Sequence, residues 1–122
     1  VYQPPVDGFF VAMDNFASTA QFFEVGVQPT LRDFIPATQE YCSLEWDHVM
    51  DGRFQKKESH LRELCFEGVF VHELLTYGFG FSEGSSSVLF TDQLFGVGLN
   101  WSVGAMRLRL QQLDTAGIPG TA

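Results

Sequence analysis

The stretch "LCFEGVFVHELLTYGFGF", residues 64–81, carries the clearest structural pattern in the sequence. Apolar residues recur in it and just before it at spacings of three and four, as a helix buried along one face requires. These residues are Leu61, Leu64, Cys65, Gly68, Val69, Val71, Leu74 and Leu75. Gly78 is well placed for the left-handed residue that ends many helices. The pattern therefore predicts a core helix with His72 and Glu73 in its middle.

The chain before this helix divides into shorter segments. Residues 8–16 predict a strand or an extended approach, and residues 17–26 place apolar side chains on one helical stripe that a glycine closes. Residues 30–46 predict a second helix that Thr30 caps and that continues towards its tryptophan. Residues 50–59 are polar, contain a glycine and two adjacent lysines, and predict an exposed loop.

After the core helix, residues 82–87 predict a flexible turn and residues 88–90 a short buried strand. A glycine-bearing link follows at residues 95–100. Residues 101–115 then place apolar side chains on two helical lines, which predicts a helix buried on much of its circumference. The chain is thus expected to be mostly helical with a few short strands, which fits part of an α/β protein.

Length and charge limit what the chain can do. Its 122 residues suffice for one modest core. The 15 acidic residues against 7 basic ones give a net charge of −8, which repels nucleic acid and anionic membranes. No apolar run is long enough to span a bilayer, and no basic region precedes an apolar stretch as in a signal peptide. The abrupt, proline-bearing start and the high aromatic content predict a piece of a larger protein; a small independent domain is the alternative.

The two cysteines, Cys42 and Cys65, lie near the end of one predicted helix and the start of another. Free core thiols are one interpretation, and they are the usual state in a cytosolic protein. We favour a structural disulfide, because both cysteines have apolar neighbours and the polar loop between them lets the helices return side by side. Such a bond contributes about 3 kcal/mol on the chain-entropy estimate. No cysteine or histidine cluster with zinc spacing accompanies the pair.

The three histidines, His48, His60 and His72, have no visible nucleophile partner, so the sequence gives little support to a Ser-His-Asp or Cys-His centre. His72 lies within an apolar helix and is expected to be a hydrogen-bonded core residue. His60 lies where the polar loop enters the helix, which is a better position for reaching a ligand. The "EGSSS" of residues 83–87 lacks the lysine and glycine spacing of a phosphate-binding loop, so we interpret it as a solvated turn.

Three blocks occur in an order and spacing that one known family shares: "YC" at residues 41–42 followed by Trp46, the helix of residues 64–81, and "VGLNWSVGAMRLRL" at residues 97–110. The segment "FFVAMDNFASTAQFF" at residues 9–23 resembles a further segment of the same family. The chain resembles the carboxy-terminal portion of the nucleoside triphosphate diphosphohydrolases, the apyrases, and is most similar to the secreted apyrases of coccidian parasites. The positions that match the family's motifs are Cys65, Gly68, Leu74, Leu75, Gly78, Phe79, Phe81, Trp101, Gly104, Met106 and Leu108.

The resemblance implies a two-lobed, ribonuclease-H-like fold of the actin-like ATPase type, with nucleotide bound between the lobes. Residues 1–91 are then expected to form part of the second lobe, and residues 92–122 a segment that returns to the first lobe. The family's phosphate-binding loops, its catalytic glutamate and its metal-positioning residues have no counterpart in this chain. The resemblance therefore implies that Mg²⁺ or Ca²⁺ is bound by portions outside the chain, which has no catalytic residue of its own.

The same resemblance implies that this chain supplies the nucleobase side of the cleft. The tyrosine and arginine that sandwich the base in related enzymes fall on Ser18 and His60. Ser18 offers no π-face and His60 only partly replaces an arginine plane, so base stacking is expected to be weakened or moved. Phe54 is either a replacement platform or an aromatic residue that packs on its own helix. Trp101 matches a cleft-lining tryptophan, although a plain core residue is the alternative.

Together these observations imply part of an apyrase that hydrolyses nucleoside tri- and diphosphates to monophosphates with a divalent cation. The resemblance also implies the Cys42–Cys65 disulfide and a secreted or lumenal location. The expected partners are these nucleotides and the remaining portion of the enzyme, without nucleic acid or membrane; a homo-oligomer is left open. The rival hypotheses are a secreted, disulfide-bonded binding domain without catalysis and a relative that senses nucleotides without hydrolysing them.

Overall fold

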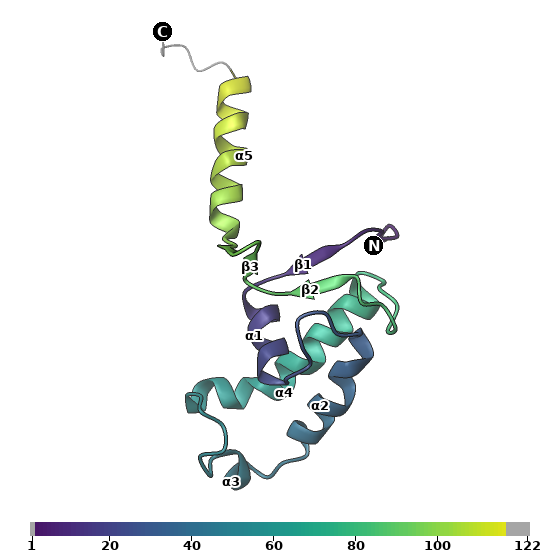
Figure 1. Ribbon diagram of the computed structural model, residues 1–122, viewed down its shortest axis with the longest axis vertical. Coiled ribbons are helices and arrows are strands. Elements are labelled where there is room, and N and C mark those ends of the chain that lie inside the picture. The colour runs from purple at the N-terminus through teal and green to yellow at the C-terminus, as the bar shows by residue number, and fades with distance from the viewer. Residues whose placement is uncertain (1, 117–122) are drawn as a thin grey trace. The chain divides into compact units, whose positions relative to one another are not determined.

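The computed structural model describes residues 2–116, and the chain divides into two units, Val1–Thr91 and Asp92–Ala122 (Figure 1). The first unit contains β1 (Phe10–Ala12), α1 (Asn15–Phe22), a 3₁₀ turn η1 (Leu31–Asp33), α2 (Phe34–Cys42), α3 (Trp46–Val49), α4 (Glu58–Glu73), a π-helical turn η2 (Leu74–Gly78) and β2 (Val88–Phe90). The second contains β3 (Gln93–Leu94), β4 (Val97–Gly98) and α5 (Trp101–Thr115). The prediction of a mostly helical chain with a few short strands is confirmed. None of the described helices is both long and apolar enough to cross a membrane.

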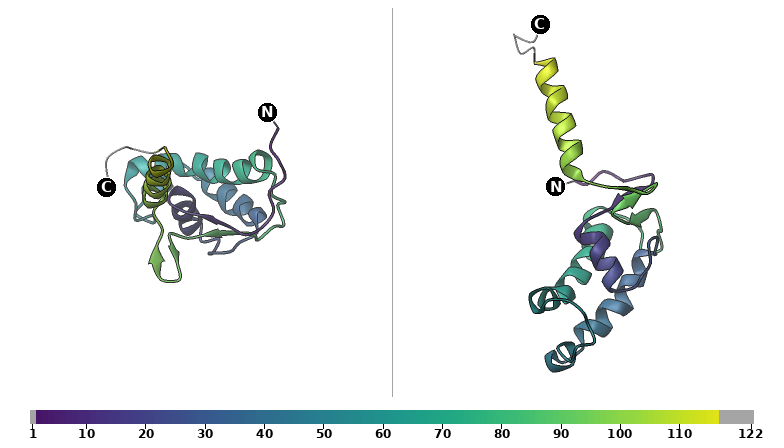
Figure 2. Two further views of the ribbon diagram at one scale, coloured as in Figure 1. Left: turned by 90° about the horizontal axis from the view of Figure 1, so that it is seen from above. Right: turned by 60° about the vertical axis from the view of Figure 1, so that its left-hand side comes forward.

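The core of the first unit lies where α1 and α2 pack against α4, and Figure 2 shows α2 and α4 side by side. One cluster of buried side chains joins these helices to the strands: Ala20, Leu31, Phe34, Val71, Leu75, Val88 and Phe90. A second cluster lies nearer the start of α4 and consists of Tyr41, Val49, Leu61 and Leu64. The apolar positions predicted at spacings of three and four on α4 thus supply residues to both clusters.

The strands of the first unit form a two-stranded parallel sheet in which Phe10 pairs with Val88 and Ala12 with Phe90. The amide of Phe10 donates to Ser87 and the amide of Thr91 donates to Ala12, so alternate residues of β1 turn their backbone groups towards β2. On the far side of β2, the amide of Phe90 donates to the carbonyl of Val27. The backbone groups of Val11 consequently point to the edge of β1 opposite β2.

The second predicted helix is interrupted. Asp33 accepts a hydrogen bond from the amide of Thr30 at 2.8 Å, as the capping-box prediction requires. The helix does not run on to Trp46, however, because α2 ends at Cys42. There the Ser43 hydroxyl donates to the Glu40 carbonyl at 2.7 Å, a local bond of the kind that competes with helix continuation. Trp46 instead begins the separate short helix α3.

Two predicted helix ends also differ from the structure. Gly26 was predicted to close the first helix, but α1 already ends at Phe22. The first left-handed residue after it is Glu24, with φ of 52°, and Gly26 is a second one, with φ of 93°. The core helix does not end in a left-handed Gly78. It widens into the π-helical turn η2, in which the amide of Phe79 donates to the Leu74 carbonyl at 2.8 Å, and the left-handed residue is Gly80, with φ of 83°.

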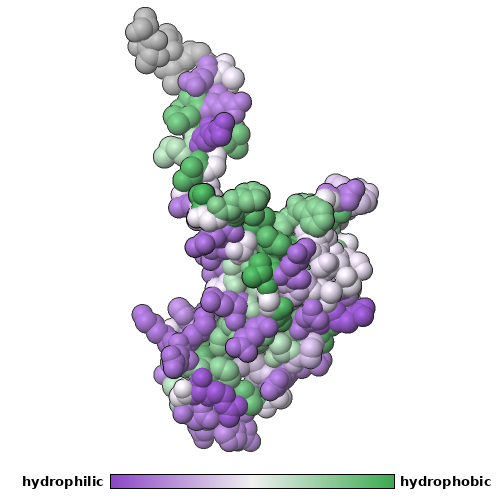
Figure 3. Space-filling view, viewed as in Figure 1, coloured by the Kyte–Doolittle hydropathy of each residue, from purple (hydrophilic) through white to green (hydrophobic). Residues whose placement is uncertain are grey.

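In the second unit, the glycine-bearing link is an antiparallel hairpin of β3 and β4. Its turn residues Phe95 and Gly96 both have positive φ, at 53° and 76°, as a two-residue hairpin turn of type I′ requires. The helix predicted after it is present as α5. The prediction that it is buried on much of its circumference is wrong for the described chain, because its large apolar side chains, from Trp101 to Leu110, are 55–71% exposed. Figure 3 shows hydrophobic and hydrophilic residues mixed along this helix.

Candidate functional site

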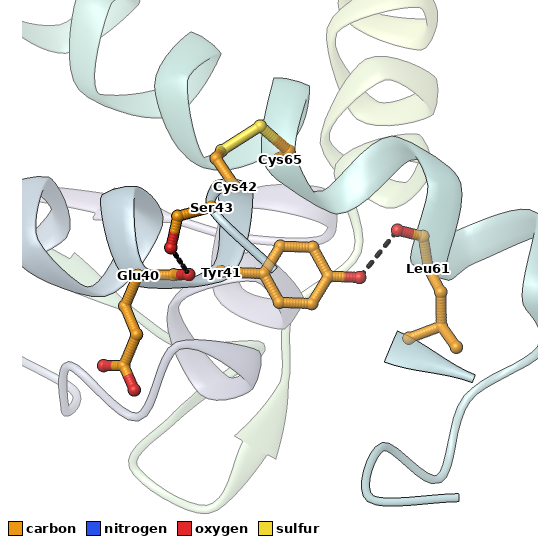
Figure 4. The surroundings of a disulfide bond; sticks show 6 residues. All are labelled: Glu40, Tyr41, Cys42, Ser43, Leu61 and Cys65. Carbon is orange, nitrogen blue, oxygen red and sulfur yellow. Dashed lines mark hydrogen bonds between the residues drawn. A yellow bond between two sulfur atoms is a disulfide. The ribbon is translucent and has the colours of Figure 1, made fainter. Parts of the chain in front are cut away.

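The disulfide that the sequence favoured is present and joins the end of α2 to the first half of α4 (Figure 4). Cys42 and Cys65 have a Cα–Cα distance of 5.1 Å. Cys42 is exposed and Cys65 half-buried, so the bond lies at the surface of the helix pair. The part of α4 that carries His60 is thereby tied to α2.

Next to the disulfide, the buried Tyr41 fixes the start of α4. Its hydroxyl donates to the carbonyl of Leu61 at 2.7 Å (Figure 4). Burial raises the pKa of the Tyr41 phenol, so the folded chain favours its neutral form, which can donate this bond. Because Leu61 follows His60 directly, the bond holds the backbone from which the His60 side chain projects.

Phe54 belongs to an aromatic group around Tyr41. Its ring centroid lies 5.4 Å from that of Phe22 and 5.3 Å from that of Tyr41. The Lys56 ammonium lies 5.7 Å from the Phe22 centroid and adds a cation–π contact. Phe54 is half-buried by these contacts. This placement favours the packing role for Phe54 and leaves only part of its ring free to meet a ligand.

Ser18 and His60 lie on two helices that pack together. Ser18 is half-buried on α1, and its hydroxyl donates to the Asn15 carbonyl of its own helix at 3.1 Å. His60 is exposed in the first turn of α4. The two helices are linked by the Thr19 hydroxyl, which donates to the Glu67 carboxylate at 3.4 Å. His60 is thus accessible to solvent, whereas the Ser18 hydroxyl is engaged in a hydrogen bond within α1.

A groove of about 460 Å³ runs between α1 and α4 and was not predicted from the sequence. Phe66 and Phe70 line it with nearly parallel rings whose centroids are 5.7 Å apart. Glu63 and Glu67 line it as well. Carboxylates repel phosphate groups, whereas aromatic faces stack on bases. The four-residue spacing of two exposed phenylalanines on one helix was the signal in the sequence that could have indicated this groove.

Trp101 is the first residue of α5 and is 71% exposed. The Asn100 side chain before it caps the helix by accepting a hydrogen bond from the amide of Ser102 at 3.0 Å. Trp101 belongs to the second unit, whereas Ser18, Phe54 and His60 belong to the first.

A metal centre finds no support in the part of the chain that the structure describes, since it contains no group of three or more His, Cys, Asp or Glu side chains placed to hold an ion. His72 is the buried histidine that the sequence predicted, with its Nδ1 atom 3.1 Å from a carboxylate oxygen of Glu73. His48 is exposed on α3.

Comparisons with known proteins cover almost the whole chain. The model of the GDA1/CD39 (nucleoside phosphatase) family matches residues 1–117. Ectonucleoside triphosphate diphosphohydrolase 8 is 34% identical in Bos taurus and 33% identical in Homo sapiens, and ectonucleoside triphosphate diphosphohydrolase 2 of Mus musculus is 32% identical. Each match includes 98% of this chain but only 24–25% of the relative, so the chain spans about a quarter of the relatives' length. The chain belongs to the GDA1/CD39 nucleoside phosphatase family.

Proposed function

We propose that this chain works as part of an apyrase that hydrolyses nucleoside tri- and diphosphates to monophosphates with Mg²⁺ or Ca²⁺. The observation that carries the proposal is the family match over residues 1–117, together with relatives named as ectonucleoside triphosphate diphosphohydrolases. The family implies an actin-like ATPase fold with nucleotide held in a cleft between two lobes. The polypeptide that contains this chain together with the remaining portion of the enzyme is called the complete enzyme below.

Within that enzyme we assign the nucleobase side of the cleft to this chain. Glu63 and Glu67 make the groove between α1 and α4 unsuited to phosphate, and the described residues offer no ligand cluster for a metal ion. The phosphate chain and the divalent cation are therefore proposed to be held by the remaining portion, which also supplies the catalytic carboxylate. His60, exposed at the start of α4, is the residue proposed to lie against the base, with Ser18, Phe54 and Trp101 as further candidates.

The two-stranded sheet of the first unit supports the proposal that the remaining portion of the enzyme adds further strands to it. Parallel sheets are normally covered on both faces and contain more than two strands. The open edge of β1 at Val11 lies beside an apolar groove of about 580 Å³, whose lining includes Phe10, Phe79 and Phe81. We propose that residues 1–91 join further strands of the second lobe there, and that the exposed apolar side chains of α5 are covered by the first lobe. Figure 3 shows hydrophobic residues at the surface over β1 and β2.

The Cys42–Cys65 disulfide supports a secreted or lumenal location, because disulfides persist in oxidising compartments. The vertebrate relatives carry the word ectonucleoside in their names, which agrees with that location. The similarity to secreted parasite apyrases remains a narrower prediction. A secreted binding domain without catalysis is the second candidate, since the disulfide and the acidic surface fit it equally well.

Phosphate release tests the proposed function. We expect the complete enzyme to release inorganic phosphate from nucleoside tri- and diphosphates when Mg²⁺ or Ca²⁺ is present, to stop at the monophosphate, and to lose this activity when EDTA is added. Residues 1–122 alone should release none, because they lack the phosphate-binding loops. A folded complete enzyme that binds nucleotides but releases no phosphate would instead identify a sensor, and one that neither binds nor hydrolyses them would favour the binding domain.

A further inference from the structure

The groove of about 460 Å³ between α1 and α4 is not lined by any of the four residues proposed to contact the nucleobase. Four of its lining residues come from α4 and form two rows: Glu63 and Glu67 in one, Phe66 and Phe70 in the other. Side chains four residues apart on a helix lie on one face, about 6 Å apart along the axis. The groove therefore presents two carboxylates and two aromatic rings that repeat with the same spacing.

The negative charge of the acidic row is not neutralised within the part of the chain that the structure describes. Glu63 and Glu67 repel each other, since like charges four residues apart destabilise a helix. No lysine, arginine or histidine among residues 2–116 forms an ion pair with either of them. Glu63 is exposed, and the half-buried Glu67 accepts its hydrogen bond from the uncharged Thr19 hydroxyl. A cationic group in the groove would relieve this repulsion.

The aromatic row fits the same kind of group. Phe66 is 69% and Phe70 47% exposed, and their rings lie at an angle of 19° to each other. Phenyl surface of this extent is stabilised when a partner removes it from water. Ammonium and guanidinium groups are attracted to aromatic faces, and the methylene stems of lysine and arginine pack on apolar surface. Both rows are therefore complementary to lysine and arginine side chains.

The spacing of the rows favours a helix as the occupant over a single small cation. A small cation can lie against one carboxylate and one ring, and it leaves the second of each without a partner. A helix that carries lysine or arginine at positions i and i+4 presents two cations about 6 Å apart, as the acidic row requires. A second copy of this chain is a poor fit, because its net charge of −8 repels the same carboxylates.

We propose that the groove between α1 and α4 docks a basic amphipathic helix of a partner protein. Two lysine or arginine side chains of that helix, four residues apart, lie against Glu63 and Glu67, and its neighbouring apolar side chains cover Phe66 and Phe70. This is the helix-in-groove mode of recognition, in which anchors with helical spacing enter a groove. The interaction goes beyond the proposed hydrolysis of nucleotides and does not depend on it.

Fluorescence anisotropy with the complete enzyme and a labelled peptide tests this docking site and needs no catalytic activity. The probe is an alanine-rich helical peptide of about 18 residues with arginines four residues apart and a neighbouring row of leucines. The control peptide has the same composition, but its arginines are scattered around the helix. We expect saturable binding of the probe, binding of the control peptide at least about tenfold weaker, and loss of affinity as salt is raised.

Variants of the two rows should weaken the binding of the probe. Glu63→Gln combined with Glu67→Gln removes both charges and should lower the affinity about tenfold, as expected for two ion pairs at a surface. Phe66→Ala should lower it about tenfold as well, because it removes an aromatic anchor. Glu45→Gln and Phe9→Ala are the matched controls, since both side chains are exposed and neither lines the groove; they should bind as the parent does.

Several results would overturn the docking site. These are a complete enzyme that does not bind the probe, equal binding of the two peptides, and parent-like binding by the double glutamine variant or by Phe66→Ala. Displacement of the probe by adenosine would assign the groove to a nucleobase instead. Self-association of the complete enzyme that Phe66→Ala abolishes would assign it to a second copy.

Discussion

Gly68→Ala is expected to lower the free energy of unfolding of the first unit, residues 1–91, by about 1–3 kcal/mol, the usual cost of overpacking a core. Gly68 is buried where α4 passes α2, and a Cβ atom placed on it would lie 2.6 Å from the Thr38 hydroxyl oxygen and 2.7 Å from a ring carbon of Phe23. Both distances are shorter than an ordinary van der Waals contact, and both neighbouring side chains are themselves packed against other residues. The gain in helix propensity from glycine to alanine, about 1 kcal/mol, opposes this cost without removing it.

Urea unfolding of the complete enzyme, followed for residues 1–91, measures the change. Gly84→Ala is the matched control, because no atom lies within 4 Å of its added Cβ; we expect a change of at most about 1 kcal/mol. Combining Gly68→Ala with Thr38→Ala removes one of the two close contacts, so the double variant should lose less stability than the two single losses added together. Parent-like stability of Gly68→Ala would show that α2 and α4 do not approach so closely.

Removing the disulfide is expected to have the other large effect. Cys42→Ser with Cys65→Ser should cost about 3 kcal/mol, because the bond closes a loop across a sequence separation of 23 residues and restricts the unfolded chain. Since Cys42 is exposed and Cys65 only half-buried, little of the cost should come from lost packing. The expected result is a lower urea midpoint for residues 1–91.

A reducing agent provides the control for this experiment. It should lower the midpoint of the parent to that of the double serine variant and leave the variant unchanged. Peptide mapping without reduction should find the two cysteine peptides linked in the parent. Recovery of both thiols in alkylated form would contradict the bond and weaken the secreted or lumenal location with it.

The helices α1, α2, α4 and α5 and the strand β2 could be predicted, because the spacing of apolar residues along the sequence reveals which side chains are buried. The π-helical turn could not, since its winding depends on how Leu75 and Phe81 reach the core around it. The hairpin of β3 and β4 was missed because a phenylalanine occupies the first left-handed turn position, where asparagine or glycine is the usual signal. The end of α2 at Cys42 depends on the hydrogen bond from the Ser43 hydroxyl to the Glu40 carbonyl, which the spacing of apolar residues does not indicate.

The candidate site was predictable to a smaller extent. The disulfide followed from two cysteines and a polar loop between them. The nucleobase assignments of Ser18, His60, Phe54 and Trp101 depended on the family resemblance and remain predictions. The packing of Phe54 against Phe22 and Tyr41 is a tertiary contact that no local pattern encodes.

Steady-state kinetics of His60→Ala in the complete enzyme test the central claim, that this chain supplies the nucleobase side of the cleft. Loss of a stacking contact worth about 1 kcal/mol should raise KM for nucleotides about threefold to tenfold and leave kcat almost unchanged, because the phosphate chemistry is proposed to lie in the remaining portion of the enzyme. His48→Ala, which removes another exposed histidine, should change neither parameter. A collapse of kcat at constant KM would place His60 in the chemistry, and an unchanged KM would place the base pocket elsewhere; either result contradicts the account.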